Sequence, residues 1–549
     1  LGILAAILCS FTYVVAQIYG VGLITTRLAG VPFELGIFLG LAGILVCSFL
    51  GGMKAVTWTQ VAQYIILIIA YLIPVIWLSV KQTGVPVPQL IYGSQLEKVT
   101  AREAELIKDP KELEVRAIFK ARADALAEKL KDVPAALAAD KAAAEKKVAD
   151  LKAANAPAPE IAAAEKALAA VPKDVEAAKK AWTAQRTSAN NRSNQLANMP
   201  RHAQQFAGDP NGDEKARTAF DTSRRNFLAL VFCLMVGTAA LPHILMRYYT
   251  TPSVKQARES VTWSLFFIFL LYFTAPALAV LVKYEVFNVL VGTPFDKLPA
   301  WIASWTKVDP ALLSVVDVNK DGIFQLAEMT IGGDIIVLAT PEIGGLPYVI
   351  SGMVAAGGLA AALSTADGLL LTMANALSHD LYYKMIDPNS SASKRVAISK
   401  VLLLVVALLA AYVAYQVHVS KNADILFLVA AAFSFAASSF FPALVLGIFW
   451  KRATAIGACA GIIAGLGIAF YYMSITHPLF RGWFGVTSPI ELWWGIQPIS
   501  AGLFGVPVGF AVIMLVSLIT PAPRKEIQEL VDHVRYPTLR GDTLNTQSS

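Results

Sequence analysis

The sequence predicts an all-α polytopic membrane protein with a soluble helical insertion. The chain has 549 residues, of which 56% are hydrophobic and only 15% are charged, and its mean hydropathy is +0.56. These values lie outside the usual composition of soluble domains. The apolar residues gather in runs of about 20, the length that an α-helix needs to cross a bilayer. Residues 98–190 differ, because they are rich in Ala, Lys, Glu and Leu.

Charge and motif content exclude several classes of function. The formal net charge is +7, but the basic residues stand at the edges of apolar runs and form no stripe interleaved with aromatics, so nucleic acid is not an expected partner. No P-loop, GxSxG or HExxH motif is present, so neither an enzyme nor direct ATP coupling is predicted. All four cysteines lie in apolar runs, typical of small buried side chains: Cys9, Cys47, Cys233 and Cys459.

Ten apolar runs are predicted to span the membrane. Three lie in residues 1–80, five in 226–450 and two in 451–520. Their approximate limits are 2–28, 33–52, 57–80, 226–249, 260–284, 347–378, 396–418, 424–450, 454–475 and 498–520. The chain opens inside the first run without a methionine or a basic flank. We interpret this run as a span whose natural beginning is missing, rather than as a signal peptide.

The distribution of Lys and Arg predicts an orientation. The short connections 250–259, 379–396 and 451–453 carry basic residues, as does the tail 521–549, so they are expected on the cytoplasmic side. Alternation then places the long loops 81–225 and 285–346 outside the cytoplasm. The lipid bilayer is therefore an expected partner, and the oligomeric state is not predicted.

The segment 81–225 is expected to be an extracytoplasmic insertion. Its part 98–190 consists of good helix formers, and prolines divide it into helix-length pieces. Most of its apolar positions are Ala, which bury little area, so loosely packed helical hairpins are expected. A low-complexity linker is the alternative interpretation.

A polar group in the middle of an apolar run is the candidate ion site. The run 346–384 is long enough to span a bilayer, yet it carries Ser364, Thr365 and Asp367 near its middle. Hydrocarbon offers no water, so these oxygens must face protein, an ion or an aqueous cavity. Oxygen ligands suit a hard cation such as sodium. The alternative is that the hydroxyls bond to their own helix and the preceding small residues 355–362 only pack helices.

Two prolines predict broken helices, which transporters use to expose backbone groups to a solute. Pro242 follows Gly237 and Thr238 in the fourth run, and Pro442 follows Ser438 and Ser439 in the eighth. The alternatives are a proline kink without a ligand and hydroxyls that repair the helix. We interpret His243 as a hydrogen-bonding core residue rather than a proton relay. No intramembrane Arg or Lys is predicted to clamp an anion.

The segment 317–328, DVNKDGIFQLAE, has the spacing of a calcium-binding loop. Oxygen ligands stand at alternate positions, Gly322 allows the sharp turn at position six, and a carboxylate closes the loop at position twelve. The predicted ligands are Asp317, Asn319, Asp321, the carbonyl of Ile323, Gln325 and Glu328. The alternative is a metal-free Asp/Asn/Gly turn.

Four ordered blocks resemble a known family. They are GGMKAVTWTQVAQYIILI (51–68), GTAALPHILMRYYTTPSVKQAR (237–258), AALSTADGLLLT (361–372) followed by HDLYYK, and FPALVLGIFWKRAT (441–454). Together they resemble the sodium:solute symporter family, and within it the bacterial cation/acetate symporter branch. The resemblance covers essentially every membrane span and leaves out the insertion 98–190.

The resemblance implies a LeuT-like bundle built from two inverted five-helix repeats, with ion and solute near the midplane. Residues 226–450 match a whole second repeat, whereas 1–80 match only the end of the first, so its first two core helices are expected to be missing. Ala361, Ser364 and Thr365 match the positions that supply half of the family's sodium site, the alanine through its carbonyl oxygen.

The resemblance also implies a function and a location. We expect cation-coupled symport of a small monocarboxylate such as acetate across a bacterial cytoplasmic (inner) membrane. Several relatives have an acidic residue on the sodium exit route where this chain has Gln60, and Asp367 is the candidate replacement, so sodium and proton coupling both stay open. The candidate solute-lining residues are Gln17, Gly237, Thr238, Pro242, Ser438 and Ser439. A membrane sensor with a transporter-like fold is the alternative function.

Overall fold

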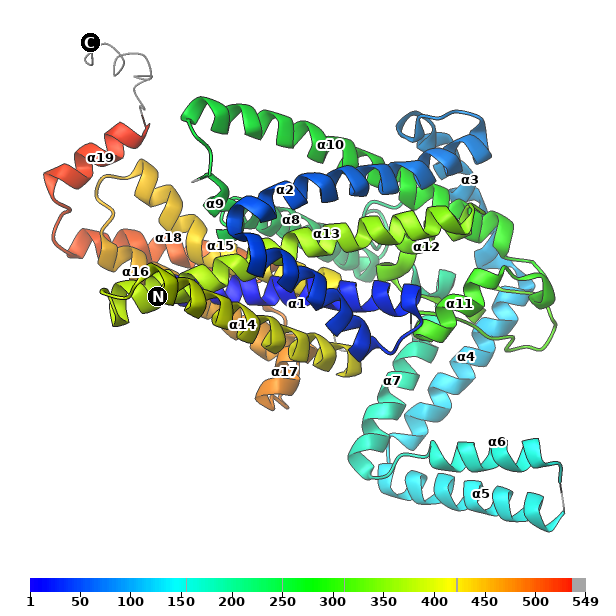
Figure 1. Cartoon of the computed structure of the whole chain (residues 1–549). Coiled ribbons are helices and arrows are strands. Elements are labelled where there is room, and N and C mark those ends of the chain that lie inside the picture. Colours follow the sequence, from blue (N-terminus) through cyan, green and yellow to red (C-terminus); the bar gives the residue numbers. More distant parts are fainter. Residues whose placement is uncertain (155, 249, 311, 421–422, 536–549) are drawn as a thin grey trace. The chain divides into compact units, whose positions relative to one another are not determined.

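The computed structural model describes residues 1–154, 156–248, 250–310, 312–420 and 423–535, and of residues 47, 49–54, 534 and 535 the backbone alone. The described chain is mostly helical (Figure 1), which confirms the predicted all-α class. It divides into two compact units. Unit 1 contains residues 1–74, 206–273 and 345–549, and unit 2 contains 75–205 and 274–344.

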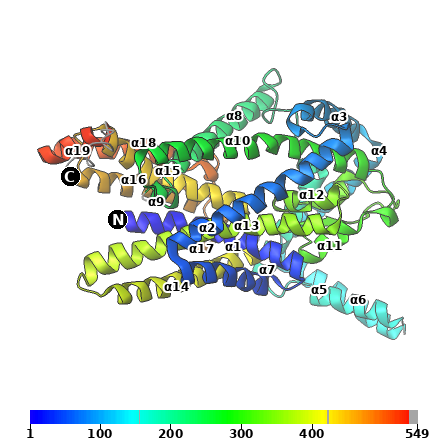
Figure 2. The same ribbon diagram turned by 45° about the horizontal axis from the view of Figure 1, so that its top comes forward.

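Unit 1 holds most of the apolar helices. Its elements are α1 (Gly2–Ala29), most of α2 (Phe33–Thr83), α8 (Glu214–Thr238), α9 (Pro242–Tyr248), the first part of α10 (Val254–Tyr284), α13 (Tyr348–Asn375), the π-helix η6 (Ala376–Ile386), α14 (Ala392–Ser420), α15 (Ile425–Phe449), α16 (Ala455–Thr476), α17 (Pro478–Phe484), the 3-10 helices η7 (Trp493–Gly495) and η8 (Pro498–Ser500), α18 (Gly502–Ile519) and α19 (Lys525–Arg535). Helix α13 lies against α1 and α14 (Figure 2), and α1 also contacts α15.

Within the described residues, nine helices are long and apolar enough to span a membrane, rather than the ten predicted. The predicted spans 33–52 and 57–80 form the single helix α2, in which only Ala55–Thr83 meets the length and hydropathy of a span. The sequence between them contains no proline, so nothing in it interrupts the helical hydrogen bonds. The orientation and the domain boundaries stay predictions, and residues 536–549 of the predicted tail lie outside the described part.

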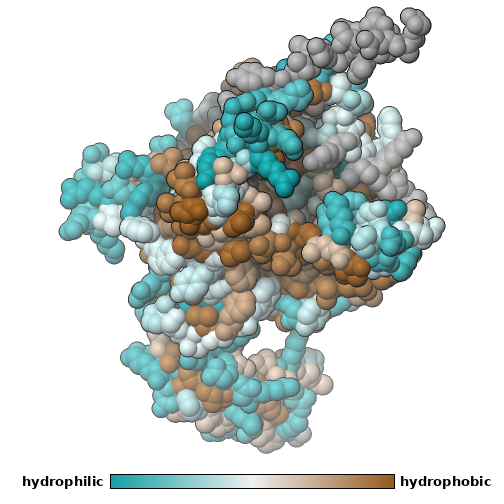
Figure 3. Space-filling model, turned by 90° about the vertical axis from the view of Figure 1, so that its left-hand side faces the viewer, coloured by the Kyte–Doolittle hydropathy of each residue, from teal (hydrophilic) through white to brown (hydrophobic). Residues whose placement is uncertain are grey.

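Many large apolar side chains remain exposed, as a lipid-facing surface requires. On α10 they include Phe266 and Phe269, which are 55% and 62% exposed. Figure 3 shows apolar residues forming a broad area on one face of the molecule. Cys9 and Cys233 are buried as predicted, but Cys459 is exposed on the apolar helix α16, and the side chain of Cys47 lies outside the described part.

Unit 2 contains the predicted helical insertion. Its elements are α3 (Pro88–Lys108), η1 (Gln195–Asn198), α4 (Pro110–Lys129), α5 (Val133–Ala153), α6 (Ala158–Ala169), α7 (Val175–Ser193), the ends of α2 and α10, the π-helix η2 (Glu285–Leu290), η3 (Phe295–Lys297), α11 (Ala300–Val308), β1 (Leu313–Val315), η4 (Leu326–Glu328), β2 (Met329–Ile331), η5 (Gly333–Ile335) and α12 (Ile336–Ile343). Strands β1 and β2 pair antiparallel, with Val315 opposite Met329, and enclose the segment 317–328.

Caps in the sequence set the helix starts of the insertion. Asp109 accepts hydrogen bonds from the backbone N–H groups of Lys111 and Glu112, and Asp174 caps α7 in the same way. Helices α4 and α7 lie side by side, and α5 pairs with α6 (Figure 1). Two small apolar clusters hold these helices, one around Phe119 and one around Trp182. The insertion is therefore a set of packed hairpins rather than a linker.

Glycines on one face of α16 set its distance from α15 and α18. Gly457, Gly461 and Gly465 recur every four residues and therefore line one face. A Cβ atom on Gly465 would lie 2.2 Å from the carbonyl oxygen of Ser438 and 2.9 Å from that of Gly505. These contacts are with backbone, so no side-chain rotation relieves them. The three helices can pack this closely only without a side chain at Gly465.

We predict that Gly465→Ala destabilises unit 1 by about 1–3 kcal/mol, because the added methyl group forces α16 away from α15. The measurement is thermal unfolding of the detergent-purified protein. Gly467→Ala is the matched control, since nothing lies within 4 Å of a Cβ atom at Gly467 on the same helix. Equal unfolding temperatures for the two variants would contradict this account of the packing.

Candidate functional site

The predicted ion-site residues lie halfway along α13, where neighbouring helices approach closely. A Cβ atom on Gly357 would lie only 2.5 Å from the Cβ of Ala70 in α2, so the two helices are in backbone-level contact one turn before the site. Helix α13 also contacts α1 and α9. The small residues of the sequence therefore bring α2 against the polar stretch of α13.

Three oxygens of the site gather within one helical turn. The hydroxyl of Ser364 donates to the carbonyl oxygen of Ala361 at 2.9 Å, and the hydroxyl of Thr365 donates to the same oxygen at 3.1 Å. All three residues are half-buried. In this structure the two hydroxyls therefore bond to their own helix, as the alternative interpretation of the sequence expects. A hydroxyl oxygen keeps its lone pairs while it donates, so the cluster retains acceptor capacity for a cation.

Helix α2 supplies polar partners to this stretch. The side-chain amide of Gln60 donates to the carbonyl oxygen of Ser364 at 2.5 Å. The hydroxyl of Ser48 donates to Oδ1 of Asp367 at 2.8 Å. Asp367 is 1% exposed, and its Oδ2 has no hydrogen-bond partner among the described residues. The structure thus brings Gln60 and Asp367, the two predicted ion-pathway residues, to the same helix pair.

Arg247 is a membrane-embedded charge that the sequence analysis did not assign to the site. It lies in α9, within the apolar span Glu214–Tyr248. A Cβ atom on Gly368 would lie 3.3 Å from Nη2 of Arg247, and the guanidinium interacts electrostatically with Asp367. The guanidinium thus faces a carboxylate of the protein itself, and the expectation that no intramembrane Arg or Lys clamps a solute anion stays a prediction. The basic residue closes the run PHILMR, where it is typical of a membrane edge, and only the fold brings it to α13.

The helix break predicted at Pro242 is present. Helix α8 ends at Thr238 and α9 begins at Pro242. Gly237 is buried against α15, where a Cβ atom would lie 2.5 Å from the carbonyl oxygen of Phe433. Thr238 is exposed, and its hydroxyl donates to Leu234 O at 2.7 Å. The two residues therefore have different surroundings: one packs helices and the other does not.

An aromatic group beside the break joins three helices. The ring of Tyr13 in α1 meets those of His243 in α9 and Phe433 in α15 edge-on, each at a centroid distance of 5.7 Å. Nδ1 of His243 is buried without a hydrogen-bond partner among the described residues. Gln17, one turn along α1 from Tyr13, is half-buried. Sequence reasoning missed Tyr13, because a tyrosine in an apolar run carries no distinguishing signal.

The break predicted at Pro442 is wrong, because α15 runs through this proline from Ile425 to Phe449. The hydroxyl of Ser439 donates to Phe435 O at 2.7 Å and lies 3.9 Å from the sulfur of Cys9 in α1. Ser438 bonds to Ser434 O and faces Gly465 and Gly505 of the neighbouring helices. Close packing on both sides keeps the helix continuous. Ser438 thus belongs to the interface with α16 and α18, whereas Ser439 faces α1.

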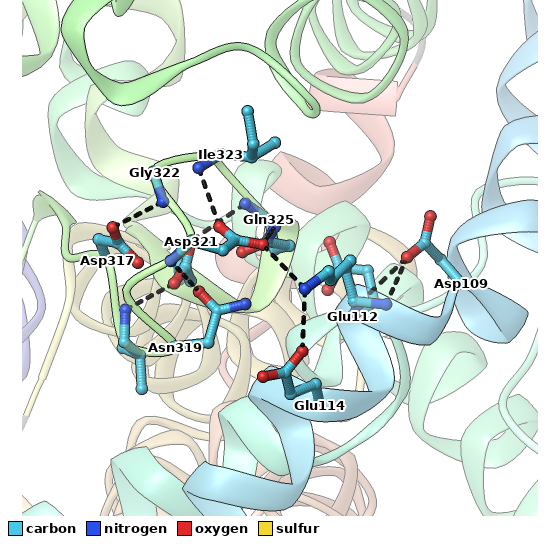
Figure 4. Close-up of polar contacts among 12 residues, drawn as sticks. Asp109, Glu112, Glu114, Asp317, Asn319, Asp321, Gly322, Ile323 and Gln325 are labelled. Carbon is cyan, nitrogen blue, oxygen red and sulfur yellow. Dashed lines mark hydrogen bonds and ion pairs between the residues drawn. The ribbon is translucent and has the colours of Figure 1, made fainter.

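In unit 2, the predicted calcium loop connects β1 to β2 (Figure 4). Asp317 Oδ2 accepts from the N–H of Gly322 at 3.0 Å, and Asp321 Oδ1 accepts from that of Ile323 at 2.9 Å. The amide oxygen of Asn319 accepts from the N–H of Asp321 at 3.3 Å. The loop therefore turns so that its polar side chains face inward. Among the described residues, no group of three or more His, Cys, Asp or Glu side chains stands as a ready metal cage.

Position twelve of this loop is buried next to an insertion residue. Glu328 accepts from the N–H groups of Val318 at 2.6 Å and Gln325 at 3.1 Å, and it is fully buried. Glu112 of α4 accepts from those of Leu326 and Ala327. Burial raises the pKa of Glu112 to about 7 against these hydrogen bonds, and burial likewise raises the pKa of Glu328.

We predict that Asp367 and Arg247 compensate each other. Asp367→Asn and Arg247→Gln should each lower the thermal stability of the purified protein, because each leaves a charge in the membrane interior without its counter-charge. The double variant should recover part of the loss, with a coupling free energy of about 1–3 kcal/mol. Arg258→Gln, which removes an exposed arginine, is the control and should combine additively with Asp367→Asn. Additivity in both pairs would rule out the interaction.

Comparison with known proteins identifies the family. The model of the sodium:solute symporter family matches residues 1–118 and 335–465. A symporter of Cupriavidus necator, itself uncharacterized, is 52% identical over 535 residues, covering 97% of this chain and 76% of that protein. A monocarboxylic acid transporter of Corynebacterium glutamicum is 29% identical over 291 residues, covering 53% of this chain and 45% of that protein.

Two further similarities are weaker. An uncharacterized symporter of Bacillus subtilis is 28% identical over 288 residues, covering 52% of this chain and 47% of that protein. The solved structure of a Na+-coupled sialic acid symporter in a substrate-bound, outward-open state matches with a TM-score of 0.49 and 14% identity, covering 95% of this chain and 75% of that one. The family model names the family, and the Cupriavidus relative, itself a symporter by name, matches almost the whole chain at high identity. The chain therefore belongs to the sodium:solute symporter family and is a transporter rather than an enzyme.

Proposed function

We propose that this protein couples sodium entry to the uptake of a small monocarboxylate by alternating access across a bacterial cytoplasmic membrane. The observation that carries the proposal is the oxygen cluster of Ala361, Ser364 and Thr365 in the middle of α13. A hydroxyl pair and a carbonyl within one turn offer oxygen ligands, which sodium prefers, at a depth where water is absent. The long loops 81–225 and 285–346 face outward in this proposal, and the C-terminus faces the cytoplasm.

Asp367 and Gln60 are the proposed ion pathway. Asp367 offers the cluster a negative charge half a turn away, with one oxygen held by Ser48 and the other unpartnered among the described residues. Gln60 holds the carbonyl of Ser364. In this proposal, a cation that leaves the cluster passes between Asp367 and Gln60. Because a carboxyl group also carries a proton, proton coupling is the alternative outcome of the transport assay below.

The proposed solute site lies at the break between α8 and α9. Interruption of a helix frees backbone groups to bind a solute. The proposed lining comes from three helices: Tyr13 and Gln17 of α1, Pro242 and His243 of α9, and Ser439 of α15. Gly237 and Thr238 form the end of α8 beside it. Ser438 is left out because it faces α16 and α18. The proposed substrate class rests on the Corynebacterium relative, which is a monocarboxylic acid transporter.

The ions proposed for the protein are sodium at the membrane cluster and calcium at the loop 317–328. Only sodium takes part in transport. Binding of sodium at α13 is proposed to favour the outward-open state, because a ligand shifts the equilibrium toward the conformation that it binds more tightly.

Uptake by proteoliposomes tests the function. We predict that labelled acetate, lactate or pyruvate accumulates against its gradient when sodium is high outside, and that accumulation stops when choline replaces sodium. A proton gradient in choline buffer and labelled alanine are the controls. Accumulation driven by protons alone would replace sodium as the coupling ion, and accumulation of none of the three acids would refute the substrate class.

The oxygen cluster is tested with Ser364→Ala combined with Thr365→Ala. Loss of two ligands should raise the sodium concentration for half-maximal uptake by roughly tenfold or more, which corresponds to about 1.4 kcal/mol. Thr372→Ala is the matched control, because this buried hydroxyl also bonds to its own helix, at Gly368 O, two turns along α13. If both variants kept the sodium dependence of the original protein, the ion site would lie elsewhere.

A further inference from the structure

We propose that the loop 317–328 binds one calcium ion and that this ion fixes the insertion helices α4 and α7 to the loop. The proposal concerns unit 2 alone and does not depend on the transported solute. It rests on the donor set of the loop, on oxygens in it that lack partners, and on contacts between the insertion and the residues that separate two of the ligands.

The twelve residues supply the donors that calcium needs. Three carboxylates, two side-chain amides and one backbone carbonyl occupy the alternating positions of a calcium loop. Half of these donors are neutral oxygens. The acidic side chains therefore make up only half of the proposed site. Gly322 has a φ of 74°, which lets the chain turn at position six.

Two donor oxygens of the loop are buried without partners. Gln325 is only 3% exposed, and its Oε1 accepts no hydrogen bond from the described residues. Oδ1 of Asp317 is likewise buried and unpartnered, while Oδ2 is held by Gly322 N–H. Nε2 of Gln325 donates to Asp321 Oδ2 at 3.1 Å, so each of the two side chains has one polar atom bonded within the loop and one without a partner (Figure 4). A buried oxygen without a partner is costly, and a cation at the centre of the loop would satisfy both.

The charge of the loop also favours a bound cation. Asp317, Asp321 and Glu328 bring three carboxylates within mutual electrostatic range. The ammonium group of Lys111, on α4, lies 3.6 Å from Asp321 Oδ2. Lys111 is 57% exposed, so its compensation is screened by water. A divalent ion bound inside the loop offsets this repulsion far better, and calcium tolerates the irregular set of six oxygen donors that magnesium does not.

Helices α4 and α7 of the insertion form hydrogen bonds with the residues between positions nine and twelve of the same loop. Glu112 of α4 accepts from Leu326 N–H and, at 3.2 Å, from Ala327 N–H. Nε of Arg192 in α7 donates to Ala327 O at 2.8 Å. Both helices therefore hold the short helix η4.

Apolar contacts reinforce this attachment. Ala327 packs with Val115 and Phe119 of α4 and Ala189 of α7, and Val318 lies against the same cluster. The calcium ligands Gln325 and Glu328 flank Leu326 and Ala327 directly. An ion that holds Gln325 and Glu328 in place therefore also fixes the N–H groups of Leu326 and Ala327, which donate to Glu112. Calcium binding and docking of the insertion should thus favour each other.

Calorimetry tests the ion. The purified full chain, freed of metal with EDTA, is titrated with calcium chloride and separately with magnesium chloride. We expect one calcium per chain with a Kd of roughly 10⁻⁴ to 10⁻³ M, the range of weak extracellular sites, and at least tenfold weaker magnesium binding. Asp317→Asn combined with Asp321→Asn should abolish the heat. Asp296→Asn, an exposed aspartate in η3 of the same unit, is the matched control and should bind as the original does.

Limited trypsin proteolysis tests the coupling. At calcium ten times above its Kd, cleavage within residues 98–190 should slow by about tenfold, because the ion suppresses opening of the docked insertion. Glu112→Gln should keep the calcium heat and lose most of this protection, because it weakens the grip on η4 without removing a ligand. Unfolding temperature and elution volume establish that each variant is folded.

Three results would overturn the proposal. The first is that the original protein releases or absorbs no heat when calcium is added. The second is that the folded Asp317→Asn/Asp321→Asn variant binds calcium as well as the original does. The third is that calcium does not slow trypsin cleavage of the original protein, or slows it equally in Glu112→Gln. If the double variant does not fold, the comparison of calcium with magnesium on the original protein decides, and equal heats for the two ions would refute a calcium loop.

Discussion

The absence of water in a bilayer core is the constraint on which unit 1 depends. Every polar group on α13 must find a partner inside the protein, and the structure shows which partners it finds. Ser364 and Thr365 bond to Ala361 O, Gln60 bonds to Ser364 O, and Ser48 bonds to Asp367. Among the described side chains of α13, the second oxygen of Asp367 and the hydroxyl of Ser351 are buried without a hydrogen-bond partner, and Arg247 supplies the charge that opposes Asp367. These polar groups are the observations that support the proposed ion site.

Much of the fold was predictable because it follows from hydrophobic length and local chemistry. Apolar runs of about 20 residues predict spans, and Pro242 predicts the end of α8, since a proline inside a helix removes a hydrogen bond. The same rule is wrong at Pro442, where α15 is continuous and Gly465 and Gly505 of neighbouring helices pack closely against it. Hydrophobic length also predicts two spans where the structure has the single helix α2, because no proline separates the apolar runs 33–52 and 57–80.

The candidate site was predictable only in part. Ser364, Thr365 and Asp367 stand out in the sequence because polar side chains are rare at membrane depth. Ser48, Tyr13 and Arg247 reach the site from other helices, and each has an ordinary local context in the sequence, so only the tertiary arrangement identifies them. The calcium-like loop is the converse case. Its spacing is explicit in the sequence, but its attachment to Glu112 and Arg192 of the insertion is not.

The central claim is that the oxygens of Ala361, Ser364 and Thr365 bind sodium. Equilibrium binding of radioactive sodium to the detergent-purified protein, competed by unlabelled sodium and by potassium, tests this claim most directly. The account predicts saturable binding that sodium but not potassium displaces and that is lost when both hydroxyls are replaced by alanine. Binding that survives loss of both hydroxyls unchanged would contradict it.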